Sequence, residues 1–564
     1  MKKICFSVLI FSLFLGFSPI RAQHDRPNIL WLTCEDISPT LSMYGDSTAH
    51  TPNLDRLAAE GLVFDNVYTV VAVCAPSRSA IITGMYPTSI GTMHMRTAHD
   101  VVSWGKRDYS GESMAVDING DKVPLYAAVI PPYVKCFPEY LRESGYYCTN
   151  NAKTDYQFAA PVTAWDENGN HAEWSHAPAG KPFFSVYNHG VTHESRIWLR
   201  RNKPQTVSPA VVPLPSYYPD DPIVRTDVAR NYSNIEVLDQ QIGEKIEALK
   251  KAGLYDKTII FFFSDHGGPL PRGKRLHYDS GLRVPFIVRI PERYKKKYGV
   301  DPSWIKNGRV DALISFVDLA PTVLSIAGVK IPEYMQGRAF MGPQRAKEPR
   351  KYIFASGDRF DEYSDRMRVV RDHRYLYVRN YHPELPAYKD IAYRKNIPMM
   401  NDLLYLHRMG RLNRAQDYWF RMFKAPEELY DCLKDPENLH NIIDDTLYAD
   451  KVKELRRALD NWLGRVGDMG AIPEKEMVMQ MWPDGIQPVT LPPRVTRKGK
   501  MLTVTCGTKG ASIAYLVSDR DFSPDLNAGW QVYFKPIPVP RGKYLYLMAQ
   551  RIGYKESEIV KIKF

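Results

Sequence analysis

The stretch "PNILWLTCED", residues 27–36, decides the fold class that this sequence predicts. It is an almost unbroken apolar run that ends in two acids, Glu35 and Asp36. A run without alternating polar positions is typical of a strand that is buried on both faces, as in a parallel sheet. Ligands of such sheets bind beyond the carboxyl ends of the strands, so we expect the two acids to lie at a functional site.

Three further stretches have the features of strands in the same sheet. "KPFFSVYNHG" (181–190) and "KTIIFFFSDHGG" (257–268) pass from apolar to polar residues in the same way, and "GLRVPFIVRIP" (281–291) is a fourth predicted strand. Helical patterns lie between them, and the longest, at 226–252, repeats apolar residues on one face. Strands that alternate with helices predict an α/β fold with a mainly parallel sheet flanked by helices.

The remainder of the chain predicts further domains after a catalytic domain at 23–350. From about residue 351 the pattern loosens into a smaller α+β region, which we place at 351–485. A proline-rich linker, "WPDGIQPVTLPPR", then leads into the segment 486–564, where short strands recur at regular spacing. In "MLTVTC" (501–506) apolar and polar residues alternate, so this segment predicts a small terminal β-sandwich.

The amino terminus has the pattern of a signal peptide over residues 1–22. Lys2 and Lys3 precede an apolar stretch, and Ala22 stands at a plausible cleavage point. The stretch is too short for a membrane helix, and no later stretch is apolar over enough residues to span a bilayer. We therefore expect an exported protein, periplasmic or secreted, with no membrane span.

The formal net charge of +12 favours an anionic partner such as a sulfated or uronic-acid glycan. Surface charge that only keeps the protein in solution is the alternative explanation. The sequence contains no helix-turn-helix, zinc-finger or RNA-binding signature, so we expect no nucleic-acid partner.

Six cysteines remain once Cys5 of the signal peptide is removed, and they are too scattered for a disulfide framework. Cys136 and Cys148 are a candidate pair. Cys34 and Cys506 fall in apolar, strand-like runs and are expected to pack as small hydrophobic residues.

The remaining thiol, Cys74 in "VAVCAPSRSAIITG" (71–84), needs a different explanation. Pro76 suits the first turn of a helix, so the stretch predicts a helix with Cys74 at its amino terminus. Unpaired N–H groups and the helix dipole favour anions there. Arg78 adds a fork of donors that suits a tetrahedral oxyanion. We therefore expect an oxyanion-binding site beside Cys74.

Two acid-bearing strand ends are expected near this anion site: Glu35 with Asp36, and Asp265 with His266. Carboxylates would repel a bound anion unless a cation lay between them, and a hard divalent ion with oxygen ligands, such as calcium, meets that need. His266 is a less typical calcium ligand, so contact with the substrate anion is its alternative role. Each residue alone has an ordinary structural explanation, but their joint occurrence at strand ends favours a site.

The run "CAPSRSAIITG" (74–84) resembles the signature of the type I sulfatases of the alkaline phosphatase superfamily, which is Cys-x-Pro-Ser-Arg, two variable residues, two apolar residues, Thr and Gly. The resemblance extends over about residues 27–440. The stretches "DHGGPLPRGK" and "YDSG" are most similar to the sulfamidase (N-sulfoglucosamine sulfohydrolase) branch. The resemblance implies an alkaline-phosphatase-like fold, and the tail resembles the β-sandwich of chitobiase-type enzymes.

In this family a maturase oxidises the cysteine to Cα-formylglycine, so the resemblance implies that modification at Cys74. The aldehyde hydrates to a gem-diol, and one hydroxyl, polarised by the metal, attacks sulfur. The second hydroxyl then loses its proton, the C=O re-forms and sulfate is expelled. The implied cofactor is a calcium ion, and the implied partners are a formylglycine-generating maturase and a sulfated carbohydrate.

The resemblance also implies the metal ligands. They are Glu35, Asp36, Asp265 and His266, together with the modified Cys74. The family usually has two adjacent aspartates where this chain has Glu35 and Asp36, so the glutamate departs from the pattern.

Four further residues match catalytic positions of the family, and a fifth, Asp155, departs from the pattern. Arg78 is expected to orient the formylglycine, Lys274 to hold the sulfate, and His193 to protonate the leaving group. Lys153 matches the lysine of a Lys-x-His pattern, but Asp155 stands where the histidine is usual. On an extended segment Lys153 and Asp155 would both face the cleft. The gem-diol proton is therefore expected to pass either to the Asp155 carboxylate or to a histidine from elsewhere in the chain.

Substrate contacts are expected from three regions that wall the pocket in this family. His94 is a candidate sulfate-pocket residue, and packing within its loop is the alternative. Arg359, Asp361 and His382 are candidate sugar contacts, and a solvated charged face is their alternative. The polar insertion at 99–136 is expected to wall the same pocket.

The leading interpretation is an exported sulfatase that acts on a terminal sugar of a glycosaminoglycan-derived substrate, with O-sulfate and N-sulfate both open. One alternative is a phosphoester or phosphonate hydrolase of the same superfamily, against which the complete signature argues. The other is a glycan-binding protein without catalysis, which the mass of the Cys74 peptide would distinguish.

Overall fold

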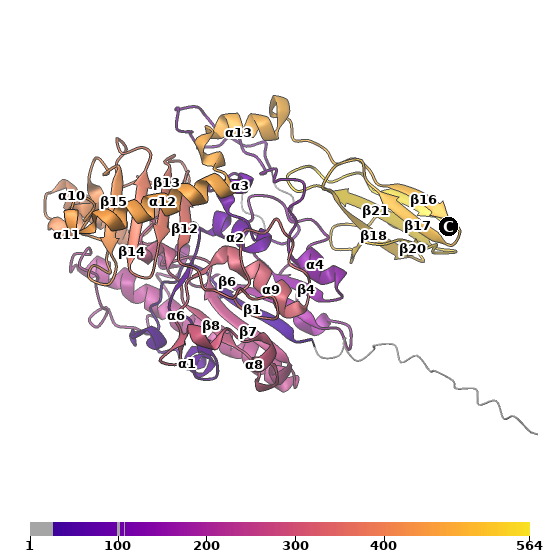
Figure 1. Cartoon of the computed structure of the whole chain (residues 1–564), viewed down its shortest axis with the longest axis horizontal. Coiled ribbons are helices and arrows are strands. Elements are labelled where there is room, and N and C mark those ends of the chain that lie inside the picture. Colours follow the sequence, from indigo (N-terminus) through magenta and orange to yellow (C-terminus); the bar gives the residue numbers. More distant parts are fainter. Residues whose placement is uncertain (1–25, 99–101, 106–107) are drawn as a thin grey trace, which may run out of the picture.

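The largest sheet of the protein has seven strands in the order β2-β8-β7-β1-β6-β4-β5. The computed structural model describes residues 26–98, 102–105 and 108–564 (Figure 1), so the predicted signal peptide at 1–22 lies outside the described residues. The strands are β1 (Asn28–Cys34), β2 (Leu62–Val63), β4 (Tyr147–Asn151), β5 (Glu167–Asn168), β6 (Phe183–His189), β7 (Thr258–Ser264) and β8 (Phe286–Arg289). Strands β7, β1, β6, β4 and β5 run parallel, whereas β8 and β2 pair antiparallel at one edge. The predicted mainly parallel sheet is confirmed.

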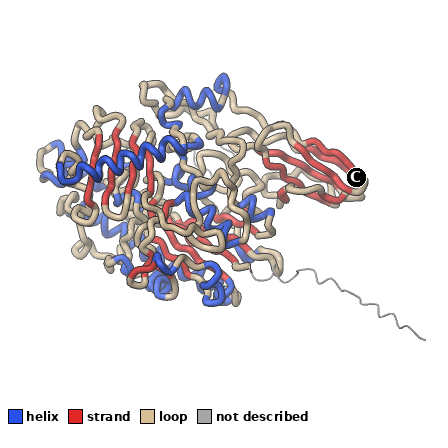
Figure 2. Tube along the Cα trace, viewed as in Figure 1, coloured by secondary structure: helices blue, strands red, loops and turns tan. Residues whose placement is uncertain are grey.

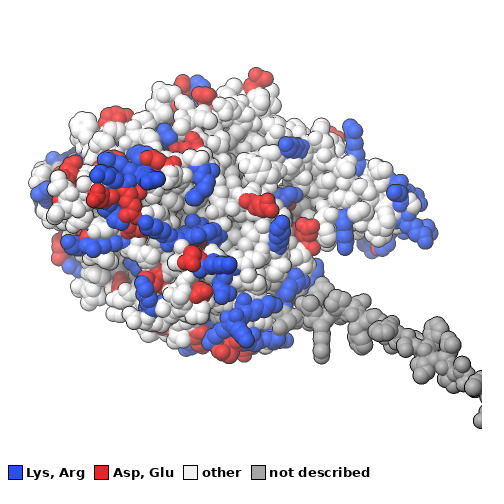
Figure 3. All heavy atoms as spheres, viewed as in Figure 1, with Lys and Arg blue, Asp and Glu red and all other residues white. Residues whose placement is uncertain are grey.

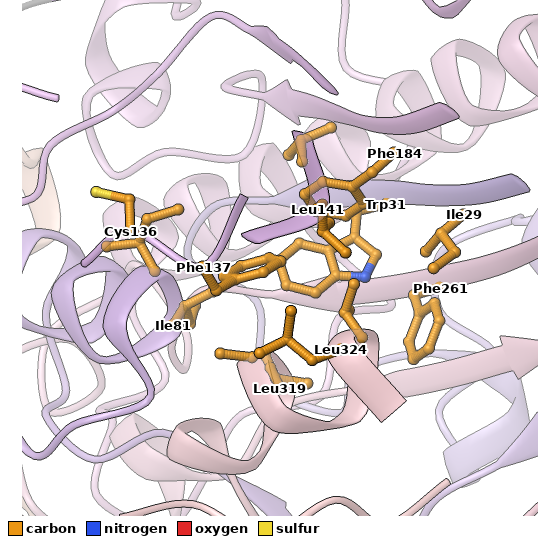
Figure 4. Close-up of a cluster of buried hydrophobic side chains, with 14 of the residues drawn as sticks. Ile29, Trp31, Ile81, Cys136, Phe137, Leu141, Phe184, Phe261, Leu319 and Leu324 are labelled. Carbon is orange, nitrogen blue, oxygen red and sulfur yellow. The ribbon is translucent and has the colours of Figure 1, made fainter. Parts of the chain in front are cut away.

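Strand β1 is buried on both faces, as its unbroken apolar run predicts. Ile29 and Trp31 pack into one core cluster, and Leu30 and Leu32 pack into a second one. The first cluster includes side chains of α2 (Cys74–Thr83), α4 (Pro138–Glu143), α8 (Glu292–Tyr298) and α9 (Leu319–Ala327), and the second includes those of α1 (Pro52–Ala59) and α6 (Pro222–Lys251). Trp31 lies at the centre of the first cluster (Figure 4), with its ring 5.1 Å from that of Phe184. The sheet is therefore the middle layer of three.

Helix α6 is the long helix that the sequence predicts, but it begins at Pro222 rather than at residue 226. Asp221 precedes it as the N-cap, and its side chain accepts a hydrogen bond from the Ile223 N–H. An aspartate followed by proline is a strong start signal, and it outweighs the weak apolar pattern of the first turn. The helix ends before Gly253, which has a positive φ of 66°.

A smaller antiparallel sheet follows, in the order β12-β13-β14-β15. Its elements, with the two helices that cover it, are β12 (Ile353–Gly357), β13 (Met367–Arg371), β14 (Tyr375–Asn380), β15 (Glu427–Asp431), α10 (Pro398–Arg408) and α12 (Ala449–Val466). Val370 and Leu429 pack against Leu455 of α12 on one face. On the other face Val369 shares a core cluster with Met400 of α10. This confirms the predicted α+β region.

The last part of the chain forms two antiparallel sheets, β16-β17-β20 and β19-β18-β21-β22 (Figure 2). The strands are β16 (Arg494–Lys498), β17 (Met501–Thr505), β18 (Ser512–Ser518), β19 (Gln531–Val532), β20 (Ile537–Pro538), β21 (Tyr544–Gln550) and β22 (Val560–Lys563). Leu502 and Val504 of β17 share a core with Leu545 and Leu547 of β21. The two sheets therefore face each other across a common core, as the predicted β-sandwich requires. The domain boundaries at 350 and 485 stay predictions.

The proline-rich linker is bound to the β-sandwich rather than extended between domains. Val489 pairs with Lys555 in a parallel bridge. Lys555 N donates to Pro488 O at 2.9 Å, and Thr490 N donates to Lys555 O at 3.0 Å. The backbone hydrogen bonds of the linker are thus satisfied by the domain that it introduces.

The structure corrects two of the cysteine predictions. All six cysteines in the part of the chain that the structure describes are free thiols, so the pairing of Cys136 with Cys148 was wrong. Cys34 is buried as predicted. Cys506 is only half-buried, because it lies just after the end of β17, where the alternation of the strand no longer applies.

No helix of the described residues is long and apolar enough to cross a membrane. On the face shown in Figure 3, basic and acidic side chains are interspersed over the main body, and basic ones gather at the tip of the β-sandwich.

Candidate active site

Polar residues follow β1, β6 and β7 where these neighbouring parallel strands end at one edge of the sheet. The predicted residues that this edge brings together are Glu35, Asp36, His193, Asp265 and His266. Helix α2 begins at Cys74, with Val73 as its N-cap, and all ten of its residues are buried. The prediction that Cys74 opens a helix is confirmed, and the helix directs its N-terminal end toward the acids.

The Cys74 thiol lies among charged groups in the interior of the protein. Its Sγ is 3.3 Å from His266 Nε2, which is in turn 3.0 Å from Asp36 Oδ1. Burial raises the pKa of the thiol, but the ammonium groups of Lys153 and Lys274 outweigh it and lower the pKa to about 7. A position that favours a thiolate also favours other anions.

Asp36 is the central acid of the site and is fully buried. Its carboxylate accepts hydrogen bonds from Lys274 Nζ at 2.9 and 3.1 Å and from the Glu194 N–H at 2.7 Å. Its own N–H donates to Asp265 Oδ1 at 3.2 Å. Burial raises the pKa of Asp36, but Lys274 and His266 outweigh this and hold the pKa well below its usual value. The group is therefore a buried anion.

Glu35 faces the other side of the site. Its Oε2 accepts a hydrogen bond from Lys153 Nζ at 2.8 Å and lies 3.8 Å from His193 Nε2. Burial raises the pKa of Glu35, but the positive charges of Lys153 and His193 outweigh this effect and lower the pKa to about 2. Burial and Lys274 lower the pKa of His193, but Asp36 and Glu35 prevail and raise it.

The Asp155 side chain lies beside Lys153 as predicted, but a turn rather than an extended segment brings the two together. Its φ of 51° puts it in the left-handed region, so the segment is not extended as predicted. Its Oδ2 is nevertheless 3.7 Å from Lys153 Nζ, because the turn directs both side chains to the same side.

Arg78 occupies the back of the site and is nearly buried. Its Nε donates to Asp265 Oδ2 at 3.1 Å, and its Nη1 donates to Asn188 Oδ1 at 2.7 Å. Asn188 was missed in the sequence, although its place in the polar end of "KPFFSVYNHG" was a usable signal.

The donor atoms of this site fit a hard divalent cation. Within the described part of the chain, two sets of side chains have ligand atoms that all lie within 4.8 Å of one another: Glu35, Asp36, Cys74 and His193, and Asp36, Cys74, Asp265 and His266. The buried carboxylates of Glu35, Asp36 and Asp265 supply the oxygen ligands that such ions prefer. The residues predicted to hold a metal are therefore brought together beside Cys74.

Sequence reasoning missed a buried network behind the site. Arg275 donates from Nη1 and Nη2 to the two oxygens of Glu194, both at 2.8 Å, and from Nε to Asp361 Oδ2 at 2.6 Å. Glu194 Oε1 lies 3.3 Å from Lys274 Nζ. The network thus holds the lysine that contacts Asp36. The one signal for this network in the sequence is that Glu194 directly follows His193 and Arg275 directly follows Lys274, both of which were predicted site residues.

We expect Arg275→Met to destabilise the protein by about 3 to 5 kcal/mol, because it leaves two buried carboxylates without their shared cation. Urea unfolding followed by circular dichroism measures this change in the free energy of unfolding. Arg374→Met is the matched control, since the Arg374 side chain is 40% exposed and solvent screens its pair with Asp431, so we expect a much smaller loss. Similar losses in the two variants would contradict a special role for the buried network.

The predicted substrate contacts Arg359 and His94 lie in a second buried network. Arg359 is 1% exposed. Its Nε and Nη2 donate to Glu474 at 2.5 and 2.8 Å, and its Nη1 donates to Met95 O at 2.5 Å. His94 Nδ1 accepts from the Arg359 N–H at 3.3 Å. Glu474 opens helix α13 (Glu474–Met481), so this network ties that helix to the catalytic domain. Sugar contact by Arg359 and a place in the sulfate pocket for His94 stay predictions.

The remaining predicted sugar contacts are Asp361 and His382. Asp361 accepts hydrogen bonds from Arg275 and from Arg96, so it supports the wall of the site rather than facing outward. His382 is half-buried, with its Nδ1 3.0 Å from Glu384 Oε1. Its partner Glu384 does not belong to the residues around Cys74, and the role of His382 stays a prediction.

An aromatic and cationic wall stands beside His193. The Arg96 guanidinium lies 4.6 Å from the centre of the Tyr393 ring, and that ring is 6.4 Å from His193 and 5.2 Å from Trp198. The Arg96 side chain is 34% exposed. A stacked cation next to aromatic faces suits an anionic sugar, and no sequence motif marked these residues.

Comparison with known proteins identifies the family. The family model "Sulfatase" matches residues 27–329, and the model "N-sulphoglucosamine sulphohydrolase, C-terminal" matches residues 272–402. An ulvan-active sulfatase of Formosa agariphila is 42% identical over 95% of this chain and 91% of that protein. N-sulphoglucosamine sulphohydrolase of Homo sapiens is 27% identical over 79% of this chain and 90% of that protein.

One solved structure shows the same fold at low identity. It is a protein in complex with its substrate D-glucosamine-2-N,6-O-disulfate, and it is 19% identical with a TM-score of 0.54 over 80% of this chain and all of that one. The fold, the site and the matched models agree, and this chain therefore belongs to the sulfatase family, near its sulfamidase branch, and is a sulfuric ester hydrolase.

Proposed function

We propose that this sulfatase is exported and removes sulfate from a sulfated carbohydrate, with formylglycine formed at Cys74 and a calcium ion held beside it. The observation that carries the proposal is the position of Cys74. Its thiol opens a buried helix between two lysines and a cluster of ionised acids. An anionic substrate is bound there by the cations, while the acids retain a metal.

The contacts of the site residues suggest two roles, sulfate binding and metal binding. Lys153, Lys274 and Arg78 bring positive charge to the oxygens of the sulfate. Glu35, Asp36, Asp265 and His266 would hold the calcium ion. Formylglycine supplies a hydrated aldehyde as nucleophile, and calcium supplies the charge that offsets the acids.

His193 is our candidate for the general acid. Its Nδ1 lies 2.8 Å from Ser195 Oγ, which fixes the ring, and its Nε2 points toward Glu35 at the site. Asp155, beside Lys153, is our candidate acceptor for the proton that leaves during sulfate release. The distances of 3.8 Å from His193 Nε2 to Glu35 Oε2 and of 3.7 Å from Asp155 Oδ2 to Lys153 Nζ support these two roles.

We expect His193→Ala to lower turnover of a sugar sulfate by about 100- to 10,000-fold and that of 4-nitrophenyl sulfate much less, because an activated phenol leaves without a donated proton. Steady-state kcat on both substrates measures this difference. His176→Ala is the control, since His176 is exposed and pairs only with Glu167 among the described residues. Equal losses on both substrates would remove His193 from the acid role.

The substrate class rests on the relatives. The relative with 95% coverage of this chain is named for activity on ulvan, so we propose ulvan saccharides as the first candidate. The sulfamidase-like match supports N-sulfated glucosamine of glycosaminoglycans as the second. Both classes would reach Cys74 as terminal sulfated sugars.

A panel of sulfated saccharides tests the proposal. The protein is produced together with a formylglycine-generating maturase, and released sulfate is measured by ion chromatography with Cys74→Ala as the blank. We expect sulfate from ulvan saccharides, from N-sulfated glucosamine, or from both. Turnover of an aryl phosphate above that of an aryl sulfate, with no sulfate released from any saccharide, would overturn the proposal.

A further inference from the structure

One end of the terminal β-sandwich lies next to the catalytic domain, and the other end projects away from it (Figure 1). Arg142 Nη2 donates to Trp530 O at 2.6 Å, and Gln550 Oε1 accepts from Val162 N at 2.6 Å. Residues of the sandwich also belong to the main core cluster of the catalytic domain: Ala514, Trp530, Tyr546, Met548 and Ile552. Such a junction fixes the sandwich relative to the catalytic site.

A cavity of about 740 Å³ lies at this junction. Its walls come from four parts of the chain: residues 103–105 and 108–110, Thr154 with residues 159–160, the segment from Trp482 to Val489, and the sandwich residues Leu526, Gln550, Tyr554, Lys555 and Glu556. Its volume falls within the range of about 300 to 1,000 Å³ that is typical of ligand sites. The catalytic domain alone would not enclose it.

The cavity and the candidate active site share a stretch of backbone, residues 153–155. Thr154, which lines the cavity, stands between Lys153 and Asp155, whose side chains face Glu35 and each other. Val102 pairs with Lys153, and Ser103 N donates to Ala152 O at 3.1 Å. One wall of the cavity is thus formed by the chain segment that carries Lys153, just after β4.

The lining suits a sugar chain. It includes four aromatic residues, Trp104, Tyr109, Trp482 and Tyr554. Trp482 is fixed, because its Nε1 donates to Ala127 O at 3.1 Å and its ring lies edge-on to Tyr109 at 5.1 Å. Aromatic faces bind the apolar faces of sugar rings, and amides and charged groups bind their hydroxyls and acidic groups. The polar lining residues include Asp108, Gln487, Gln550, Lys555 and Glu556.

We propose that this cavity binds further sugar units of the same glycan whose sulfate lies at Cys74, so that the terminal β-sandwich is part of the substrate site. The inference rests on the proposed carbohydrate sulfatase function and extends it to oligosaccharides. Binding of units away from the reacting bond contributes to transition-state stabilisation, so a longer substrate should have a higher kcat/KM than a sulfated monosaccharide.

Substitutions in the sandwich wall test the proposal. Tyr554→Ala and Lys555→Ala change half-buried and exposed side chains that line the cavity. Lys543→Ala is the matched control, because Lys543 is a half-buried lysine of the same sandwich that pairs with Asp519 and does not line the cavity. The substrates are a sulfated ulvan tetrasaccharide, the corresponding sulfated monosaccharide, and 4-nitrophenyl sulfate. Thermal unfolding of each variant reports its folding.

We expect wild type to prefer the tetrasaccharide over the monosaccharide. Each cavity variant should lose about 10-fold in kcat/KM on the tetrasaccharide, while kcat/KM on the aryl sulfate changes less than about 2-fold. Lys543→Ala should match wild type on all three. In a Cys74→Ala background, the tetrasaccharide should also quench tryptophan fluorescence, and the Tyr554→Ala substitution should weaken this binding.

Three results would overturn the inference: unchanged tetrasaccharide turnover in both variants, equal losses on the tetrasaccharide and the aryl sulfate, or no preference of wild type for the longer chain. Each of these leaves a carbohydrate sulfatase in place. Failure of the proposed function has a different signature, namely turnover of the aryl sulfate by wild type with no sulfate released from either saccharide.

Discussion

Cys74→Ala is expected to lose about 10⁶-fold in kcat, because removal of a nucleophile costs about that much and no other group of the site can replace it. Sulfate release from a sugar sulfate measures the loss. In the active wild-type protein, mass spectrometry of the peptide that contains residue 74 should show the replacement of H₂S by oxygen that formylglycine requires. Cys74→Ser, which offers one hydroxyl and no aldehyde, should be similarly impaired.

The control for this prediction is Cys148→Ala. Cys148 is also a buried free thiol, in β4, and it lies away from the acids around Cys74. We expect both alanine variants to unfold within about 1 to 2 kcal/mol of wild type, while only Cys74→Ala loses turnover. Fully active protein whose residue 74 is an unmodified cysteine would contradict the formylglycine proposal.

Asp36→Asn is expected to lower kcat by about 10³-fold or more, the upper end of what loss of one preorganised electrostatic group costs. Asp36 is fully buried, belongs to both sets of candidate metal ligands and has its pKa held well below the usual value. The substitution keeps the shape of the side chain and removes its charge. Elemental analysis should therefore show less than stoichiometric calcium, and chelation of wild type should reproduce the loss of activity until calcium is restored.

Asp227→Asn is the matched control. Burial raises the pKa of Asp227 to about 7, and its Oδ2 accepts a hydrogen bond from Met399 N at 2.7 Å, which an amide oxygen can also accept. This variant should keep its metal and its turnover. Wild-type turnover in Asp36→Asn, or full activity of metal-free protein, would exclude a metal at this position.

Much of the site was predictable from local sequence because of a property of parallel sheets. The carboxyl ends of β1 and β7 lie side by side, since Cys34 and Ser264 are paired in register. Polar residues that follow the two strands must then meet, however distant they are in the chain. The helix start at Cys74 was also local, because the residues of its first turn carry the signal.

The supporting residues were not predictable in the same way. Glu194, Arg275 and Arg96 are single charged residues in polar stretches, and such residues usually lie on the surface. Arg275 is instead 1% exposed, because Glu194 and Asp361 supply the two carboxylates that satisfy its guanidinium. The partners are 81 and 86 residues away, so no local pattern reveals them.

The sequence by itself determined the α/β class, the strands that end in acids, the helix start at Cys74 and the family to which the chain belongs. Each follows from apolar runs, strong helix signals or a contiguous motif, all of which act over a few residues. Only the tertiary structure decided that Arg359 turns inward to Glu474, that Cys136 and Cys148 remain apart, and that the β-sandwich closes a cavity beside Lys153. These features depend on which partners lie within hydrogen-bond or packing distance in space, and that is settled only when distant segments pack together.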